Sequence, residues 1–264
     1  MNLRGEGVKL SAYVRRNWIT TRRNLFTLFE IAFWPCISLF SVGLLTRFLE
    51  LRGDMVAFVQ VGTISLSVMQ VCQLDIAYAL LFDMWSKSVK HQFMAPITPA
   101  HLVVGAWIMG VIRGTAAFGI MAGISALVFR FDFLAAGPLA LALFLAGLFL
   151  NAAIIGTLVC FLILSFGPRA EVVAWSVVSI VLMICGIYYP VSVLPEPLTL
   201  LAAAIPVTHF LEYFRSHYGF VPSFPHPLAW GLALSAVYLT GGLLALQLTL
   251  RRARRSGVLL RLSE

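Results

Sequence analysis

The sequence predicts an all-α integral membrane protein, and three observations lead to this fold class. Of its 264 residues 60% are hydrophobic and only 11% are charged, whereas soluble domains carry about 25% charged residues. Apolar runs of about 20 residues, the length that crosses a ~30 Å hydrocarbon core as a helix, recur along the chain. Arginines and lysines gather in a few segments between these runs and at both ends, as expected for loops on one side of a membrane.

Six apolar runs are long enough to be spanning helices. They cover residues 25–45, 55–82, 102–129, 138–166, 172–189 and 228–250. The first run follows several arginines, but it is too long for a signal peptide and no small-residue cleavage pattern follows it. With no internal repeat or linker, we expect one transmembrane domain over residues 1–264.

The distribution of Lys and Arg predicts the orientation. Fourteen of these residues fall on the side of the two termini and four on the other side. The positive-inside rule then places both termini in the cytoplasm of a multi-pass protein, which we expect in a bacterial inner membrane. The net charge of +8 suits anionic membrane lipid as a partner and requires no nucleic acid.

The first 24 residues have the pattern of an amphipathic helix. Four apolar residues share an arc of about 80° on a helical wheel, and four arginines lie on the opposite side. The two sets are Leu10, Val14, Trp18 and Leu25, and Arg15, Arg16, Arg22 and Arg23. We expect a helix lying on the cytoplasmic leaflet, with a simple basic flank as the alternative.

The loop of residues 83–105 has enough pattern for a separate cytoplasmic element. Asp83 is suited to cap a short helix, in which Trp85, Val89 and Phe93 recur at intervals of four and form an apolar stripe, with Lys87 and Lys90 between them. Such a stripe needs cover, either from a partner protein or from the spans of the chain itself.

Residues 190–227 form the longest segment on the outer side, and they are apolar yet rich in proline. Proline removes a backbone donor and interrupts a helix, so this stretch does not read as a continuous span. Its eight-residue apolar piece, 198–205, is long enough to enter a leaflet and return but not to cross it. We therefore expect an extracellular re-entrant helical hairpin between the fifth and sixth spans, with Pro190 ending the fifth span, Pro195 and Pro197 in the turn, and Pro206 starting the return.

No catalytic motif is present. The chain has no phosphate-binding loop, nucleophile elbow or dinucleotide fingerprint, and its Cys and His residues lack the spacing of a metal site. The candidates for function are therefore the ionisable residues inside the spans, Glu30, Asp75 and Arg113. Arg113 is placed to pair with Asp75, Glu30 or both. Such a pair would either gate the cytoplasmic half of the protein or fix the register of the helices. A proton relay is the weaker interpretation.

Two motifs give the chain a resemblance to a known family. "YYPVSVLPEPLTLLAAAIPVTHFLEYFR" and "SVKHQFMAPITPAHLVVG" are similar to two signature segments of the membrane subunits of type 2 ABC exporters, also described as the type V fold. These include nodulation-factor, daunorubicin-type drug and O-antigen polysaccharide permeases. The chain departs from them at Lys90, where the family usually has an acidic residue, and this puts in doubt which charges an ATPase partner presents there.

The resemblance implies a permease homodimer working with two separate ATPase subunits, which would hold the ATP and Mg²⁺, while this chain holds no cofactor. The loop with Asp83, Trp85, Lys87, Val89, Lys90 and Phe93 would be a coupling helix against the ATPase, and the N-terminal arm a connecting helix against the same subunit. The substrate would be an amphipathic or lipid-linked glycolipid, polysaccharide or drug. Pro190, Pro195, Pro197, Pro206, Phe210 and Arg215 would belong to a lid over the exit path.

A second hypothesis from a different class is a self-contained, proton-coupled secondary transporter that uses Asp75. A membrane-embedded enzyme would need a cluster of polar catalytic residues at one depth, and the sequence shows none.

Overall fold

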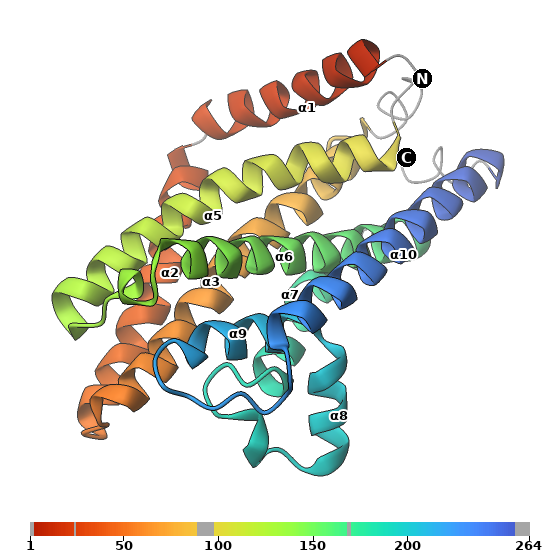
Figure 1. The fold of residues 1–264 in the computed structure, drawn as a ribbon. Coiled ribbons are helices and arrows are strands. Elements are labelled where there is room, and N and C mark those ends of the chain that lie inside the picture. Colours follow the sequence, from red (N-terminus) through yellow and green to blue (C-terminus); the bar gives the residue numbers. More distant parts are fainter. Residues whose placement is uncertain (1–2, 24, 89–97, 168–169, 257–264) are drawn as a thin grey trace.

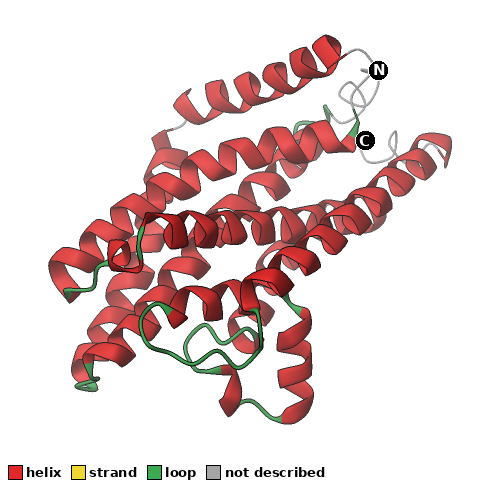
Figure 2. Cartoon of the chain, in the orientation of Figure 1, coloured by secondary structure: helices red, strands yellow, loops and turns green. Residues whose placement is uncertain are grey.

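The computed structural model describes residues 3–23, 25–88, 98–167 and 170–256, and within these ranges the chain is helical and contains no strand (Figure 2). The α-helices are α1 (Leu3–Arg23), α2 (Leu25–Phe48), α3 (Gly53–Trp85), α5 (Pro99–Phe129), α6 (Pro138–Phe166), α7 (Glu171–Ile184), α8 (Glu196–Ala204), α9 (Pro206–Ser216) and α10 (Pro227–Ser256). Two 3₁₀ turns, η1 (Phe133–Ala136) and η3 (Val191–Val193), lie in the connections. The predicted all-α membrane fold is confirmed.

Helices α3 and α6 form the centre of the bundle (Figure 1). Five helices of the described chain are long and apolar enough to cross a membrane, and 72% of the apolar window is buried in both α3 and α6. The corresponding shares for α2, α5 and α10 are 22%, 28% and 11%, so these helices present most of their apolar surface outward. In lipid such surface needs no further cover, because hydrocarbon tails are as apolar as the side chains.

Helix α7 is shorter than the sequence predicted. The apolar run 172–189 suggested one span, but the helix ends at Ile184 and has 14 residues, about 21 Å at 1.5 Å per residue. Gly186 has a positive φ of 68°, a conformation that glycine adopts without steric cost and that ends the helix. The last residues of the predicted span are therefore non-helical backbone.

The proline-rich segment forms the expected broken hairpin. Helices α8 and α9 meet at a bend of 91°, and Pro206 is the first residue of α9, where its missing N–H has no helical partner to lose. Pro195 directly precedes α8 and Pro197 lies in its first turn, as expected for the turn. Pro190 differs from the expectation, because α7 has already ended at Ile184 before the chain reaches it.

Helices α3 and α5 are longer than a membrane requires. Their 33 and 31 residues measure about 50 and 46 Å. A 30 Å core crossed at a 40° tilt needs only about 39 Å of helix. We place the surplus at the Trp85 end of α3 and the Pro99 end of α5, because Asp83 and His101 there contact α1 (Figure 1).

Helix α1 runs alongside the projecting end of α5. Glu6 contacts His101, Tyr13 packs on Gly105 and Thr21 contacts Arg113, so successive turns of α1 meet successive turns of α5 in the same direction. The predicted N-terminal helix is thus present, but it lies along α5 and does not stand apart on the leaflet. Tyr13 and Thr21 are buried in this contact, while Trp18 is half exposed.

Candidate functional site

Polar contacts between α1, α3 and α5 form what we call the arm-end seam. Its members are Glu6, Arg16, Thr21, Asp75, Asp83, His101 and Arg113. At its inner end, Arg113 of α5 donates hydrogen bonds to the Asp75 carboxylate of α3 and to the Thr21 hydroxyl of α1. One guanidinium therefore ties three helices together, and the predicted pairing of Arg113 with Asp75 is confirmed. The side chain of Glu30 lies outside the described part of the structure.

Asp83 lies inside α3, near its end, and most of the short helix that it was predicted to cap falls on residues outside the described part of the structure. Its carboxylate accepts hydrogen bonds from Arg16 Nη1 at 3.1 Å and from Ser88 Oγ at 3.2 Å. Asp83 thus fixes α1 to the projecting end of α3, since its own side chain is nearly buried and Arg16 reaches it from the surface.

The outer end of the seam joins α1 to the start of α5. Oε2 of Glu6 lies 2.6 Å from Nε2 of His101, and Oε1 accepts a hydrogen bond from Lys9 at 2.7 Å. Nδ1 of His101 accepts the backbone N–H of Thr98, which closes a capping box at the start of α5 and leaves Nε2 to donate to Glu6. The hydrogen bond from Lys9 lowers the pKa of the Glu6 carboxyl below its ordinary value.

Sequence reasoning missed four members of this contact: Glu6, Tyr13, Thr21 and His101. Glu6, Tyr13 and Thr21 follow one another at seven and eight residues, which places them on one helix face beside the apolar arc. That polar spacing could have indicated a face that packs on protein.

At the opposite end, Arg215 of α9 holds what we call the hairpin joint. Its guanidinium donates hydrogen bonds to three backbone carbonyls, those of Gly186 at 2.6 Å, Ile187 at 2.7 Å and Phe58 at 3.0 Å. Its Cζ also lies 3.4 Å from the centre of the Phe58 ring. These carbonyls belong to the non-helical backbone after α7 and to α3, so a buried side chain supplies the donors that the broken helix lacks.

The hairpin joint depends on close approach to α3. A Cβ atom at Gly62 would lie 1.8 Å from the Ile187 carbonyl oxygen and 2.9 Å from Arg215 Nη2. Phe210 anchors the same helix from its other side, fully buried against Gly147 of α6, where a Cβ would meet its ring at 2.2 Å. Both Phe210 and Arg215 thus fix α9 in the protein interior.

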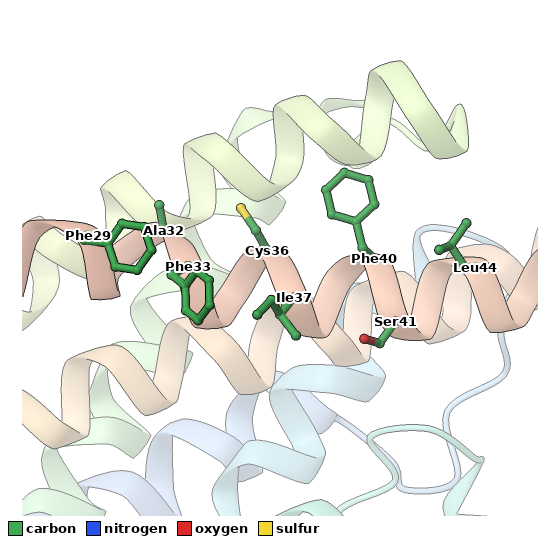
Figure 3. A pocket seen from close by; sticks show the side chains of 8 residues that line it. All are labelled: Phe29, Ala32, Phe33, Cys36, Ile37, Phe40, Ser41 and Leu44. Atoms are coloured by element: carbon green, nitrogen blue, oxygen red, sulfur yellow. The ribbon is translucent and has the colours of Figure 1, made fainter.

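An apolar groove lies on the outer face of α2 (Figure 3). It has a volume of about 430 Å³ and all its lining side chains come from α2. These are Phe29, Ala32, Phe33, Cys36, Ile37, Phe40, Ser41 and Leu44. With one hydroxyl and one thiol in the lining, the groove suits acyl chains or another apolar helix better than a polar ligand.

Comparison with known proteins places the chain in a family. The family model described as "ABC-2 type transporter" matches residues 8–219. The chain belongs to the ABC-2 type transporter family. An uncharacterized protein of Archaeoglobus fulgidus is 43% identical over 49 residues, which cover 19% of this chain and 77% of that relative.

ABC-2 type membrane subunits have no ATPase site of their own and work with ATP-binding subunits. The matched range contains the hairpin joint and every member of the arm-end seam except Glu6. Two of the residues predicted to couple this ABC-2 subunit to its ATPase lie at the end of α3. Trp85 is the last residue of the helix, half exposed and edge to face with Phe82, and Lys87 follows in a turn with positive φ. Val89, Lys90 and Phe93 lie outside the described residues. Of the connecting-helix residues, Arg15, Trp18, Arg22 and Arg23 are exposed on α1, and Arg16 contacts Asp83.

Proposed function

We propose that this ABC-2 subunit is the membrane-spanning part of an ATP-driven exporter that moves an amphipathic or lipid-linked substrate out of the cytoplasm or inner leaflet. Two copies would work with two ATPase subunits, which bind the ATP and Mg²⁺. The observation that carries the proposal is the arm-end seam, because it joins α1 to the parts of α3 and α5 that project beyond a membrane. A push on this end is transmitted to two spanning helices together.

Positive charge supports a cytoplasmic position for this end. Arg15, Arg22 and Arg23 are exposed on α1, and Arg251 and Arg252 are exposed near the end of α10. An ATPase seated there would contact the exposed Trp85 and the projecting end of α3. Closure of the ATPase dimer on ATP would then move α3 and α5 through the ion pairs of Asp83 and Asp75.

We propose that the hairpin covers the exit of the substrate path, at the end of the bundle opposite the arm-end seam. Non-helical backbone at membrane depth is tolerated where it is buried in protein or lines a cavity, and the hairpin joint satisfies that backbone. Helix α8 packs less deeply, with Leu200 and Leu201 exposed, so it is the part of the hairpin that faces outward. Short connections at this end leave the hairpin as its main cover in the described chain.

The alternative of a proton-coupled transporter loses support from the contacts of Asp75. A proton site needs a carboxylate that is free to exchange its proton with the aqueous path. Asp75 is instead engaged by Arg113, which donates a hydrogen bond to its carboxylate and binds Thr21 of α1 at the same time.

The test uses the full chain purified together with an ABC-type ATPase of the same organism and reconstituted in proteoliposomes. We expect ATP-dependent transport of a fluorescent lipid-linked glycan or a hydrophobic drug, and a loss of ATPase stimulation in Trp85→Ala. Trp230→Ala is the matched control, because Trp230 is an equally exposed tryptophan at the start of α10, at the hairpin end. Uptake driven by a proton gradient without ATP would overturn the proposal.

The position of the hairpin is tested separately by a cysteine at Ala203, at the end of α8. An impermeant maleimide added from outside should label it in whole cells. Labelling from the cytoplasmic side alone would contradict an extracellular lid.

A further inference from the structure

A second cavity lies at the hairpin end, between α9, the segment around η3 and the loop that precedes α10. Its volume is about 230 Å³, below the roughly 300–1,000 Å³ of pockets for drug-sized ligands, so it has room for one small group. The residues that determine its chemistry are Phe58, Ser192, Glu212, Arg215, Phe220 and Ser223. Ser192 and Ser223 are exposed, so the cavity opens to the surface between them.

The floor of this cavity has a buried donor and a buried carboxylate. Arg215 is 3% exposed, and its Nε–H has no hydrogen-bond partner within the described residues, although its other nitrogens donate to the three carbonyls of the hairpin joint. Glu212 is 9% exposed and its Oε2 accepts the backbone N–H of Phe224 at 3.2 Å. Oε1 of Glu212 remains as an acceptor at the cavity. A buried N–H such as Arg215 Nε is normally satisfied, and Oε1 of Glu212 is free to accept, so together they point to a ligand that both donates and accepts hydrogen bonds.

The walls are apolar and partly aromatic. The rings of Phe58 and Phe220 lie 5.2 Å apart, edge to face, and Pro190, Val191 and Pro222 complete the lining. A ligand for this cavity must therefore have an apolar surface for the walls in addition to polar groups for the floor and the serine rim.

Three ligand classes fit poorly. An anion attracted to Arg215 would meet the carboxylate of Glu212, and a cation attracted to Glu212 would meet the guanidinium. A wholly apolar group would leave the buried Nε–H and the carboxylate oxygen unsatisfied. A neutral ring that carries hydroxyls on its edge and C–H groups on its face meets each requirement.

We propose that this cavity is a binding site for one neutral, hydroxyl-rich ring, such as a pyranose unit of the headgroup of the transported amphiphile. Hydroxyls of the ring donate to Glu212 and accept from Arg215, and its C–H face packs on the aromatic wall. The substrate class named here rests on the proposed export function. The binding site itself requires neither ATP nor the ATPase.

The experiment measures binding to the full chain in lipid nanodiscs by saturation-transfer NMR. The probes are methyl glucopyranoside, methyl galactopyranoside and methyl mannopyranoside, with inorganic phosphate, choline and cyclohexane-methanol as representatives of the other classes. We expect at least one pyranoside to bind. Phosphate, choline or cyclohexane-methanol binding more tightly than every pyranoside, or no pyranoside binding at millimolar concentrations, would overturn the proposal.

Two variants test whether the pyranoside binding measured by NMR takes place in this cavity. Glu212→Gln keeps an oxygen for the Phe224 N–H but replaces the free acceptor with a donor, so pyranoside binding should weaken at least about tenfold. Ser223→Phe fills the exposed mouth and should abolish binding. His217→Ala is the control, since His217 is exposed on the turn after α9 and does not line the cavity.

Equal pyranoside binding in all three variants would place the ligand elsewhere and overturn the site. Unchanged thermal unfolding of Glu212→Gln and Ser223→Phe confirms that a loss of binding is local. Export that fails in proteoliposomes while binding behaves as expected would count against the proposed function alone.

Discussion

The arm-end seam and the hairpin joint each contain an arginine that connects three segments, mostly buried in the seam and fully buried in the joint, but they satisfy it differently. Arg113 in the seam is bound by a carboxylate and a hydroxyl on the side chains of two other helices. Arg215 in the joint is bound by three backbone carbonyls and by the face of Phe58. The first set of partners consists of side chains that rotate, and the second is fixed to the backbone.

This difference indicates which parts of the molecule are able to move. Side-chain partners follow a helix that shifts by an ångström or two, so the hydrogen bond of Arg113 with Thr21 survives a displacement of α1 along α5. Carbonyl partners require the backbone of α3 and the end of α7 to keep their positions. We therefore assign movement to the arm end and a fixed anchor to the hairpin joint.

The largest expected effect is that of Arg215→Met. Removal of the guanidinium leaves the non-helical carbonyls of Gly186 and Ile187 without donors in a buried site, and we expect a loss of about 3–5 kcal/mol in the free energy of unfolding. Unfolding in mixed micelles, by titration with a denaturing detergent, measures it. His217→Ala on the same turn should change it by less than about 0.5 kcal/mol. Equal free energies of unfolding for the two variants would show that Arg215 is not a fixed anchor, and the hairpin joint would then not differ from the arm-end seam.

Asp75→Asn should have a smaller effect on stability and a larger one on coupling. The charged hydrogen bond that is lost contributes roughly 1.5–3 kcal/mol, because both side chains are mostly buried. Adding Arg113→Gln to Asp75→Asn should recover part of this loss, since no unpaired charge then remains. ATPase stimulation in proteoliposomes tests the coupling, and a variant that keeps full stimulation and transport would show that the pair only fixes helix register.

Much of this fold follows from local sequence. The long apolar runs predicted the spanning helices because a membrane imposes both length and helical structure, and Pro206 predicted the break before α9 because proline acts on its own turn. The pair of Asp75 and Arg113 was also accessible, since both are ionisable residues in apolar runs and have few possible partners.

The features that sequence did not reveal depend on distant partners. Apolar residues continue to Tyr189, yet α7 ends at Ile184: Gly186 adopts a positive φ, and the open turn is then held by Arg215, which is 29 residues from Gly186 and 28 from Ile187. Asp83 resembles a helix cap locally, but its partner Arg16 is 67 residues away. Pattern within a window of twenty residues contains no information about such contacts.

Gly62→Ala tests the rigidity of the hairpin joint with one methyl group. Its Cβ would collide with the Ile187 carbonyl, so the backbone on both sides must shift, and we expect a loss of about 1–3 kcal/mol in the free energy of unfolding. Gly119→Ala in α5 is the matched control. A Cβ there has no neighbouring atom within 4 Å, and alanine should be neutral or stabilise the helix by up to about 1 kcal/mol. An unchanged free energy of unfolding in Gly62→Ala would mean that the hairpin joint is no more rigid than the arm-end seam.

The smallest expected effect is a pH dependence of α1 docking. The pKa of Glu6 is lowered from 4.5 in the folded protein, mainly by the hydrogen bond from Lys9, so the carboxylate favours the folded contact at pH above 4.5. This contribution is lost as the pH falls from about 5 through the lowered pKa, because the folded state must then take up a proton that weakens its contacts with Lys9 and His101. Hydrogen exchange of α1, corrected for the intrinsic rate and referenced to α6, should show protection decreasing over this range. Glu6→Gln should remove that decrease in protection and leave α6 unaffected. A decrease of the same size in the variant would show that another titrating group loosens α1. The mobility of the arm end would then depend on contacts other than those of Glu6.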